Sequence, residues 1–341
     1  MKSGFFGVVA VASLGLMAQS ALAQCLEAEA NDSRATANPC VISAGGTITG
    51  NTTSASGVGF DYFRVQTAPL PLGIYRHRLL ITSTTPGHAG TIRGNGQTAA
   101  PADTLPGIPW NGVVGAPNTT ELAAQTSSTA TTPARFNQWY GFGKSEEMYY
   151  RVTGGAGTTA DYVATMETVP VVATPIGIYA PGLITIDTFA EGHSTDTDLK
   201  IYDSNLNAIL GYENDDESVL AGTPGTGATL QSWLPRTYAP GTYFLAISNF
   251  HLSNNNASAS DDDFRTGNTL DFPNIIVNSS TTANLNMQFT IADSLGTTLT
   301  VPNTKLGAYD VNWFTFTVTP EPGSLALLAV GGLALIRRRR A

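Results

Sequence analysis

Acidic and amide side chains alternate near the start of the chain, in a pattern that could bind a divalent cation. Residues 27–32 read Glu-Ala-Glu-Ala-Asn-Asp. Alternate residues of an extended strand share a face, so Glu27, Glu29 and Asn31 line up on one side and Asp32 lies at the following bend. Carboxylate and amide oxygens are the hard ligands that calcium takes. The residues alone leave open a solvated acidic start that binds no ion.

A second acidic group lies in the later half of the chain. Asp196 and Asp198 precede an apolar run, and Asp215 and Asp216 follow an asparagine. If these carboxylates converge in the fold, they could also hold a cation. Aspartate and asparagine cap tight turns as well, by bonding to their own backbone, so turn chemistry is the alternative interpretation.

Side chains typical of catalysis form no recognisable set. The four histidines, at positions 77, 88, 193 and 251, form no His-Glu-x-x-His, and the chain has neither a Gly-x-Ser-x-Gly elbow nor a Walker loop. His193 lies close to Asp196 and Asp198, but we expect it to be neither a ligand nor a catalytic residue. The sequence therefore predicts a protein that is not an enzyme. An exported hydrolase of unrecognised type is the less favoured alternative.

Short strand-like runs must position these groups, because helical periodicity is nearly absent. Several runs alternate apolar and polar residues, as half-buried antiparallel strands do, and clusters of Gly, Pro, Asn and Asp separate them. The runs are 62–65, 79–81, 148–152, 183–186, 199–202, 243–247, 287–291 and 313–318. We predict an all-β chain with jelly-roll-like antiparallel β-sandwiches. Residues 94–132 and 254–269 are expected to form long surface loops.

The expected number of domains depends on internal echoes. Pro-Leu-Gly-Ile-Tyr at 71–75 recurs as Pro-Ile-Gly-Ile-Tyr at 175–179, and 147–152 resembles 241–246. We therefore place one sandwich in residues 24–170 and a second in 171–319. A single large sandwich with chance matches is the alternative.

The first 23 residues have the pattern of a secretory signal peptide. Lys2 precedes an apolar run that ends in Ala-Leu-Ala at 21–23. A basic start, an apolar middle and a small-x-small exit are typical of such a leader, so we expect a signal helix that leader peptidase cleaves after Ala23. Cys25 also suggests lipidation, but Gln24 is not the small residue that precedes a lipidated cysteine.

The last residues form a tripartite tail. Pro320-Glu321-Pro322 is followed by an apolar stretch over 325–336 and then by Arg337, Arg338, Arg339 and Arg340. As a helix the stretch spans about 18 Å, less than the roughly 30 Å of a bilayer core. We therefore expect a short apolar helix in transient membrane contact, with the arginines on the cytoplasmic side. An ordinary membrane anchor is the alternative.

This order of Pro-Glu-Pro, apolar helix and arginine cluster resembles the PEP-CTERM sorting signal. The resemblance implies recognition by an exosortase, a membrane protease-transpeptidase. It also implies delivery to the cell surface or extracellular matrix, where exopolysaccharide would be a partner. It covers only residues 320–341 and implies nothing about the activity of the rest of the chain.

The start of the mature chain resembles a second family. The Glu-x-Glu-x-Asn-Asp-Ser of 27–33, the Gly-x-Ile-x-Gly of 46–50 and the Asp-Tyr-Phe of 61–63 are similar to the bacterial pre-peptidase C-terminal (PPC) domain, a small jelly roll. The resemblance implies a calcium site made by Glu27, Glu29, Asn31, Asp32 and Asp61. The family's companion aspartate is missing, because Val58-Gly59-Phe60 precedes Asp61. Residues 196–245 resemble the same class of domain.

Charge and cysteine content narrow the function further. Removing Lys2, the four terminal arginines and Glu321 takes Lys+Arg from 17 to 12 and Asp+Glu from 26 to 25, which leaves a net charge near −13. Such a body is not attracted to phosphate backbones, so nucleic-acid binding is not expected. Cys25 and Cys40 are expected to pair in an oxidising compartment, which stabilises the fold by about 3 kcal/mol.

Taken together, these patterns predict an exported, non-catalytic surface module that calcium stabilises and that acts structurally or by contacting a ligand. The alternative is an adhesive protein that binds carbohydrate. Aromatic side chains could then stack on sugar rings, although large aromatics also fill sandwich cores. The aromatic candidates are Trp110, Trp139, Tyr140 and Trp233.

Overall fold

The computed structural model describes residues 23–52, 59–83, 87–97, 117–127, 135–154, 160–189, 191–215, 230–256 and 270–320. Over these ranges the chain is all-β, with one 3₁₀ turn at Arg34–Thr36. No helix in these ranges is long and apolar enough to cross a membrane. The expected signal helix and C-terminal apolar helix fall in residues 1–22 and 321–341, outside the described residues.

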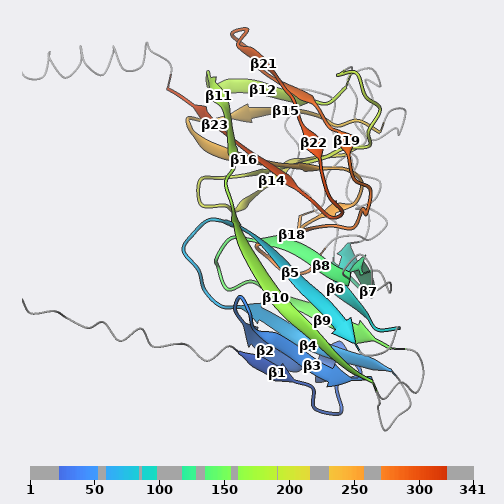
Figure 1. Ribbon diagram of the computed structural model, residues 1–341. Coiled ribbons are helices and arrows are strands. Elements are labelled where there is room, and N and C mark those ends of the chain that lie inside the picture. Colours follow the sequence, from blue (N-terminus) through green and yellow to red (C-terminus); the bar gives the residue numbers. More distant parts are fainter. Residues whose placement is uncertain are drawn as a thin grey trace, which may run out of the picture.

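Two facing sheets form the first sandwich (Figure 1). One has the strand order β1-β3-β10-β5-β8-β18-β17 and the other β2-β4-β9-β6-β7. Residues alternate between the core and the surface, as the two-residue period of a strand requires: Met148, Tyr150 and Val152 of β9 are buried and pack in one core with residues of the facing sheet. The strands are β1 (Gln24–Leu26), β2 (Asn38–Ile42), β3 (Thr47–Asn51), β4 (Phe60–Thr67), β5 (Ile74–Ser83), β6 (Ala89–Gln97), β7 (Pro117–Thr126), β8 (Arg135–Gly141), β9 (Glu147–Thr153), β10 (Asp161–Val171), β17 (Leu252–Ser253) and β18 (Ile275–Asn278).

The second sandwich is built from two smaller sheets and a short two-stranded pair. The sheet orders are β11-β23-β16-β13-β14 and β15-β12-β20-β21, and β19 pairs with β22. Ile184, Ile186, Leu245 and Phe316 are among the side chains that fill its core. The strands are β11 (Thr174–Tyr179), β12 (Gly182–Asp187), β13 (Asp198–Tyr202), β14 (Ala208–Asn214), β15 (Trp233–Tyr238), β16 (Gly241–Ser248), β19 (Leu285–Asn286), β20 (Phe289–Asp293), β21 (Thr298–Val301), β22 (Thr304–Lys305) and β23 (Asn312–Val318).

The strand pattern of the sequence is confirmed, but its loops and strand directions are not all as expected. Seven of the eight predicted runs lie within strands, and the eighth, 287–291, overlaps β20. Residues 94–97 and 117–126, expected in a loop, form the end of β6 and β7 instead, because pairing between these two strands overrides weak propensity. Residues 257–269 of the other expected loop lie outside the described ranges.

Three strand pairs are parallel rather than antiparallel: β1 with β3, β2 with β4, and β11 with β23. The physical reason is clearest for β2 and β4. The chain between them passes through β3 in the facing sheet, so it reverses direction twice and returns in its original direction. The echo of 71–75 at 175–179 does not mark equivalent strands either, because Tyr75 continues along β5 whereas Tyr179 ends β11.

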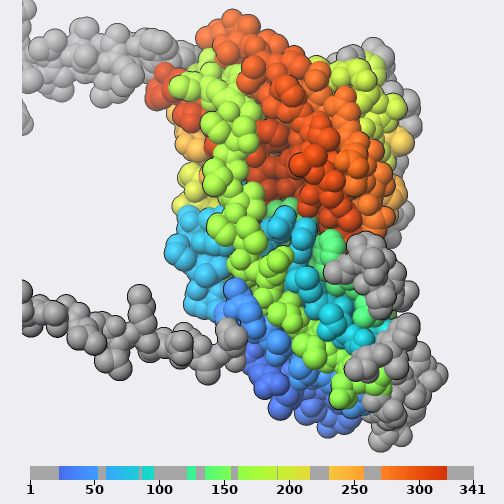
Figure 2. Space-filling view, in the orientation of Figure 1, coloured from blue at the N-terminus to red at the C-terminus, as the bar shows by residue number. Residues whose placement is uncertain are grey.

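A third apolar cluster joins the two sandwiches. Phe142 of the first packs on Tyr202 of the second at 5.1 Å between ring centroids, and Tyr140 packs on Trp313 at 6.0 Å. The chain passes from β10 to β11 along the outer surface of this junction, which is the green path in Figure 2. Segment 270–278, expected in the second domain, contributes buried side chains and β18 to the first sandwich. Residues on both sides of the expected boundary at residue 170 therefore build the first sandwich.

Trp313 provides a test of this junction. Trp313→Ala removes a buried ring that touches Tyr140, Phe142 and Tyr202, so we expect it to lower the free energy of unfolding by about 3–5 kcal/mol, measured by urea denaturation with circular dichroism. Leu306→Ala, at a side chain that is 71% exposed, is the control and should change little. Equal effects of the two substitutions would contradict a shared core.

Candidate cation site at the N-terminal strand

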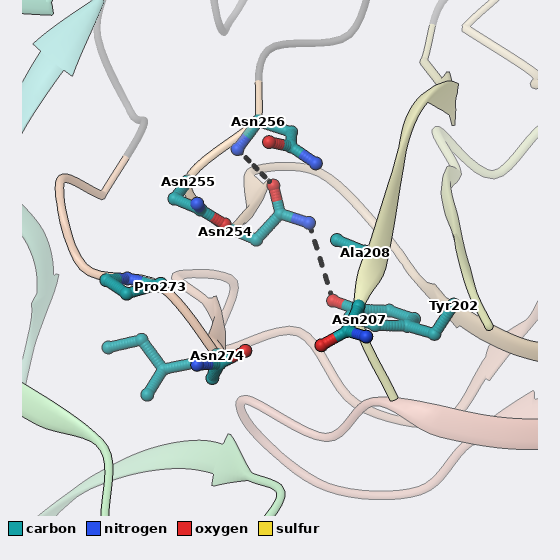
Figure 3. A pocket seen from close by; sticks show the side chains of 9 residues that line it. Tyr202, Asn207, Ala208, Asn254, Asn255, Asn256, Pro273 and Asn274 are labelled. Carbon is teal, nitrogen blue, oxygen red and sulfur yellow. Dashed lines mark hydrogen bonds between the residues drawn. The ribbon is translucent and has the colours of Figure 1, made fainter. Parts of the chain in front are cut away.

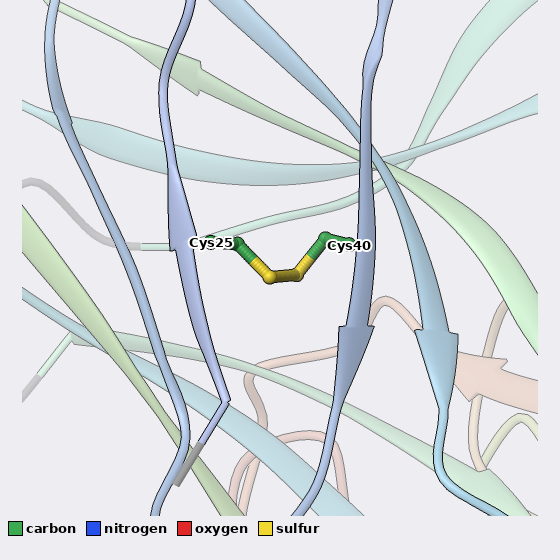
Figure 4. Close-up of a disulfide and its surroundings, with 2 residues drawn as sticks. All are labelled: Cys25 and Cys40. Atoms are coloured by element: carbon green, nitrogen blue, oxygen red, sulfur yellow. A yellow bond between two sulfur atoms is a disulfide. The ribbon is translucent and has the colours of Figure 1, made fainter. Parts of the chain in front are cut away.

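The N-terminal segment is fixed to both sheets of the first sandwich. Strand β1 pairs with β3, and the Glu27 N–H donates to the carbonyl oxygen of Thr49 at 2.9 Å. A disulfide between Cys25 and Cys40 joins β1 to β2, with 5.5 Å between the two Cα atoms (Figure 4). Because β1 and β2 belong to different sheets, this bond closes one edge of the sandwich and holds the acidic segment that follows β1.

Asn38 shapes that acidic segment. Its side chain accepts the Ala28 N–H at 3.0 Å and donates to the Ala28 carbonyl oxygen at 2.9 Å. The same Oδ1 accepts the Nδ2 of Asn31 at 2.8 Å, and the Asn31 carbonyl oxygen accepts the Tyr62 N–H at 2.9 Å. Asn31 is completely buried, yet its Oδ1 has no hydrogen-bond partner among the described residues. An amide oxygen is therefore held in the interior, where a polar atom is favourable only when it is paired.

Three carboxylates lie close together in this part of the sandwich, and one of them, Glu29, accepts the Asn31 backbone N–H at 3.4 Å. Glu27, Glu29 and Asp61 each place one oxygen within 4.8 Å of the others. Two oxygens on one calcium ion lie at most about 5 Å apart, because each Ca–O distance is 2.3–2.6 Å. The spacing thus fits ligands of a single ion.

Asp61 is the buried member of the group. It has no exposed surface, and its Oδ1 has no partner in the described ranges, while Oδ2 accepts the Tyr162 hydroxyl at 2.7 Å. Burial raises the pKa of Asp61 to about 7; the Tyr162 hydrogen bond opposes the rise, and repulsion from Glu27, Glu29 and Asp32 adds to it. A bound cation would offset both the burial and the repulsion.

Glu27 shows the same effect more weakly. Burial raises the pKa of its carboxyl, the backbone N–H of Asn51 lowers it, and the charge of Glu29 raises it. Of the five residues predicted as ligands, the structure brings together Glu27, Glu29 and Asp61. Asn31 has a buried side-chain oxygen, and Asp32, outside that group, acts on Asp61 through its charge.

Two residues that help to build the site were missed or left unexplained by the sequence. Tyr162 lies opposite Gly50 in the β3–β10 register. A Cβ on Gly50 would lie 2.5 Å from the Glu27 Cβ and 2.7 Å from the Tyr162 hydroxyl, so only glycine leaves room for both side chains. Gly50 belongs to the Gly-x-Ile-x-Gly pattern, but a single tyrosine in a strand carries no signal of its role.

The second acidic group does not assemble in the same way. Asp196, Asp198 and Asp215 are not part of any group of three close metal-ligand atoms within the described ranges. Asp198 is buried and its Oδ2 accepts the Leu252 N–H at 2.6 Å, so this carboxylate positions the start of β17. Asp216 lies outside the described residues.

The aromatic and histidine candidates are mostly structural. Trp139 and Tyr140 lie on β8 and are buried, so they are not available to stack on a sugar; Trp233 is partly buried, and Trp110 lies outside the described residues. His193 is held between the Gln288 carbonyl oxygen at 2.8 Å and the Thr195 N–H at 3.1 Å.

A separate hollow of about 150 Å³ lies beside the junction of the sandwiches (Figure 3). Asn254 forms its centre: its Nδ2 donates to the Tyr202 hydroxyl at 3.4 Å and its Oδ1 accepts the Asn256 N–H at 2.8 Å. The polar lining comprises Tyr202, Asn207, Asn254, Asn255, Asn256 and Asn274. These side chains carry no charge but offer both donors and acceptors.

Comparison with known families identifies the tail but not the body. The PEP-CTERM protein-sorting motif matches residues 318–340. The match begins at the end of β23, where Pro320 is exposed, and it continues through Glu321, Pro322 and the four arginines, which lie outside the described residues. No curated protein matches the chain, and the resemblance of the body to PPC domains stays a prediction. The chain thus carries the signal of an exported protein that an exosortase targets for sorting to the cell surface.

Proposed function

We propose that the body of this protein is a non-catalytic structural module of the cell surface or extracellular matrix, and that calcium stabilises it. One observation carries the proposal: Glu27, Glu29 and the buried Asp61 each place an oxygen within 4.8 Å of the others. The resemblance of residues 27–33 and 46–63 to PPC domains supports it.

The role of the ion follows from where its ligands lie. Glu27, Glu29 and Asn31 come from the segment after β1, whereas Asp61 is on β4. An ion shared between them ties the N-terminal segment to the sandwich, close to the disulfide that already holds it. Calcium takes six to eight oxygens, so water would complete the shell. The proposed ion is thus a structural brace, and no nucleophile or acid–base pair is assigned to it.

Calcium is expected to raise the melting temperature of the protein relative to a chelator. An ion at 100 times its Kd stabilises the folded state by about 2.7 kcal/mol. Glu27→Gln and Glu29→Gln should each reduce the shift, whereas Glu147→Gln, at a partly exposed glutamate on β9 outside the cluster, should keep it. Differential scanning calorimetry with calcium, magnesium or chelator measures this. A melting temperature insensitive to calcium would rule the ion out.

Asp61 predicts the pH dependence of the ion-free protein. Its folded pKa of about 7 lies above the ordinary aspartate value of 3.8, so the folded state binds this proton more tightly. The resulting stability is fully present below about pH 4 and is lost as the pH rises through 7. Asp61→Asn, which can still accept the Tyr162 hydroxyl, should flatten the fall measured by denaturation in chelator from pH 5 to 8. Other buried carboxyls add the same pH dependence to the wild type and to Asp61→Asn. Stability that falls equally steeply with pH in the two proteins would therefore contradict the role of Asp61.

A second candidate function is carbohydrate binding in the hollow around Asn254. Amide side chains pair donors with acceptors, as sugar hydroxyls do, and none of the described residues that line the hollow is charged. Its 150 Å³ is below the usual 300–1,000 Å³ of small-molecule sites, so it suits one sugar ring at the end of a glycan.

A glycan array tests this second candidate. Asn256→Ala should abolish any binding by the full chain, because it removes an amide from the lining. Asn205→Ala, which changes the hairpin after β13 outside the hollow, should leave it intact. Binding that survives Asn256→Ala, or no binding to any glycan, would count against this candidate and leave the structural role.

A further inference from the structure

The second sandwich contains a buried lysine in contact with a buried asparagine. Lys305 of β22 has no exposed surface, and Asn249, directly after β16, is 6% exposed. The Lys305 Nζ lies 2.8 Å from the Asn249 Oδ1. A carbonyl bond is about 1.23 Å long, so the amine nitrogen lies within about 4 Å of the amide carbon Cγ. An amine and an amide this close are the two reactants of amide exchange.

We propose that Lys305 and Asn249 form an intramolecular isopeptide bond. The neutral Nζ attacks the Asn249 Cγ, and the Nζ–Cγ bond forms as the carbonyl electrons move onto Oδ1. The carbonyl then re-forms, the Cγ–Nδ2 bond breaks, and one proton passes from Nζ to Nδ2. Ammonia leaves, so the product is one amide between the two side chains. No electron is transferred to another molecule, and neither water nor an oxidant is consumed.

Ser280 contacts both reacting groups. Its carbonyl oxygen accepts a hydrogen bond from the Lys305 Nζ at 3.0 Å, and its Oγ accepts one from the Asn249 Nδ2 at 3.0 Å. The Asn249 backbone is held as well, because its carbonyl oxygen accepts the Asn278 Nδ2 at 2.9 Å. Groups held in this way react at an effective concentration far above any in free solution. Ser280 is therefore a positioning residue, and its hydroxyl lies beside the nitrogen that must leave.

Burial also favours the reactive form of the lysine. It lowers the pKa of Lys305 to about 8, against the attraction of the Asp310 carboxylate, which raises it. A larger fraction of the amine is thus uncharged near neutral pH than for a lysine in water, and only the uncharged amine is a nucleophile. The Asp310 carboxylate attracts the positive charge of Lys305. It therefore stabilises the ammonium group until Nζ loses its extra proton and can attack.

A second lysine–asparagine contact serves as an internal comparison. The Lys144 Nζ lies 2.7 Å from the Asn207 Oδ1, but Asn207 is exposed to solvent. Water competes for the amine and the amide there, so the same contact is expected not to react. Burial, and not contact alone, distinguishes the two pairs.

The position of the bond explains what it would do. Both cysteines of the chain are in the first sandwich, at positions 25 and 40, so no disulfide can brace the second. A bond between Asn249 and Lys305, 56 residues apart, would link the end of β16 to β22 and enclose β17 to β21. An amide cross-link would stabilise the second sandwich against unfolding. Unlike a disulfide, it is not cleaved by reducing agents, which suits a protein at the cell surface. The proposal does not depend on calcium or on the sugar hollow.

Peptide mapping of the purified full chain tests the bond. Trypsin cuts after Lys and Arg, so unreacted protein releases peptides 237–265 and 266–305 separately. The bond removes the free amine that trypsin needs at Lys305. The reacted protein therefore gives 237–265 joined to a peptide that begins at 266 and continues past 305, and the joined mass is lower by one ammonia. Recovery of free 266–305 in full yield, with no branched peptide, would overturn the proposal.

Variants distinguish this bond from other cross-links. Lys305→Arg keeps the charge and the hydrogen bonds but should lose the branched peptide, and so should Asn249→Ala. Lys144→Arg is the matched control and should keep it. A branched peptide that links 144 to 207 in similar yield would contradict the role of burial. Because the wild-type digest is decisive by itself, the test does not depend on the variants folding.

Discussion

The carboxylate of Asp61 lies in the interior of the first sandwich, and that burial constrains the N-terminal segment around it. An ionised group taken out of water costs several kcal/mol unless it is paired. The neighbouring groups add negative charge: Glu27, Glu29 and Asp32 all repel it. Among the residues that the structure describes, the Tyr162 hydroxyl is its one hydrogen-bond donor. Such a cluster is unfavourable by itself, and the proposed cation would offset its repulsion. The disulfide, Asn38 and Gly50 then make sense as parts that keep the cluster assembled.

Polar contacts make the two sandwiches a single body around their shared aromatic cluster. Gln138 of the first sandwich donates to the Tyr309 carbonyl oxygen at 2.9 Å and to Asp310 at 3.1 Å. The Tyr140 hydroxyl accepts the Val311 N–H at 3.1 Å. Because these groups are buried and paired, relative motion of the sandwiches would leave polar groups unsatisfied. This junction also fixes the asparagine-lined hollow, whose walls come from both sides of it.

The sorting motif and the acidic cluster lie at opposite ends of the folded chain. The sorting motif begins at the end of β23, whereas the acidic cluster comes from the segment after β1 and from β4, in the other sandwich (Figure 1). The proposed calcium ion is therefore in the half of the molecule that is farther along the chain from the tail. The disulfide, the ion and the proposed isopeptide bond would each brace a different part of a fold that functions outside the cytoplasm.

Local patterns in the sequence determined the class of fold and the ends of the chain. A two-residue apolar period marks a strand wherever it occurs, and a sorting tail is a contiguous signal, so both can be found without tertiary contacts. Glu27 and Glu29 could be named as candidate ligands because they lie within a short run of alternating acidic and amide residues. Only the tertiary structure decided which other groups join them. Tyr162 reaches Asp61 from 101 residues away, Asp198 is used to hold Leu252, and segment 270–278 enters the first core. Such pairings depend on how distant strands stack, and no local period records that.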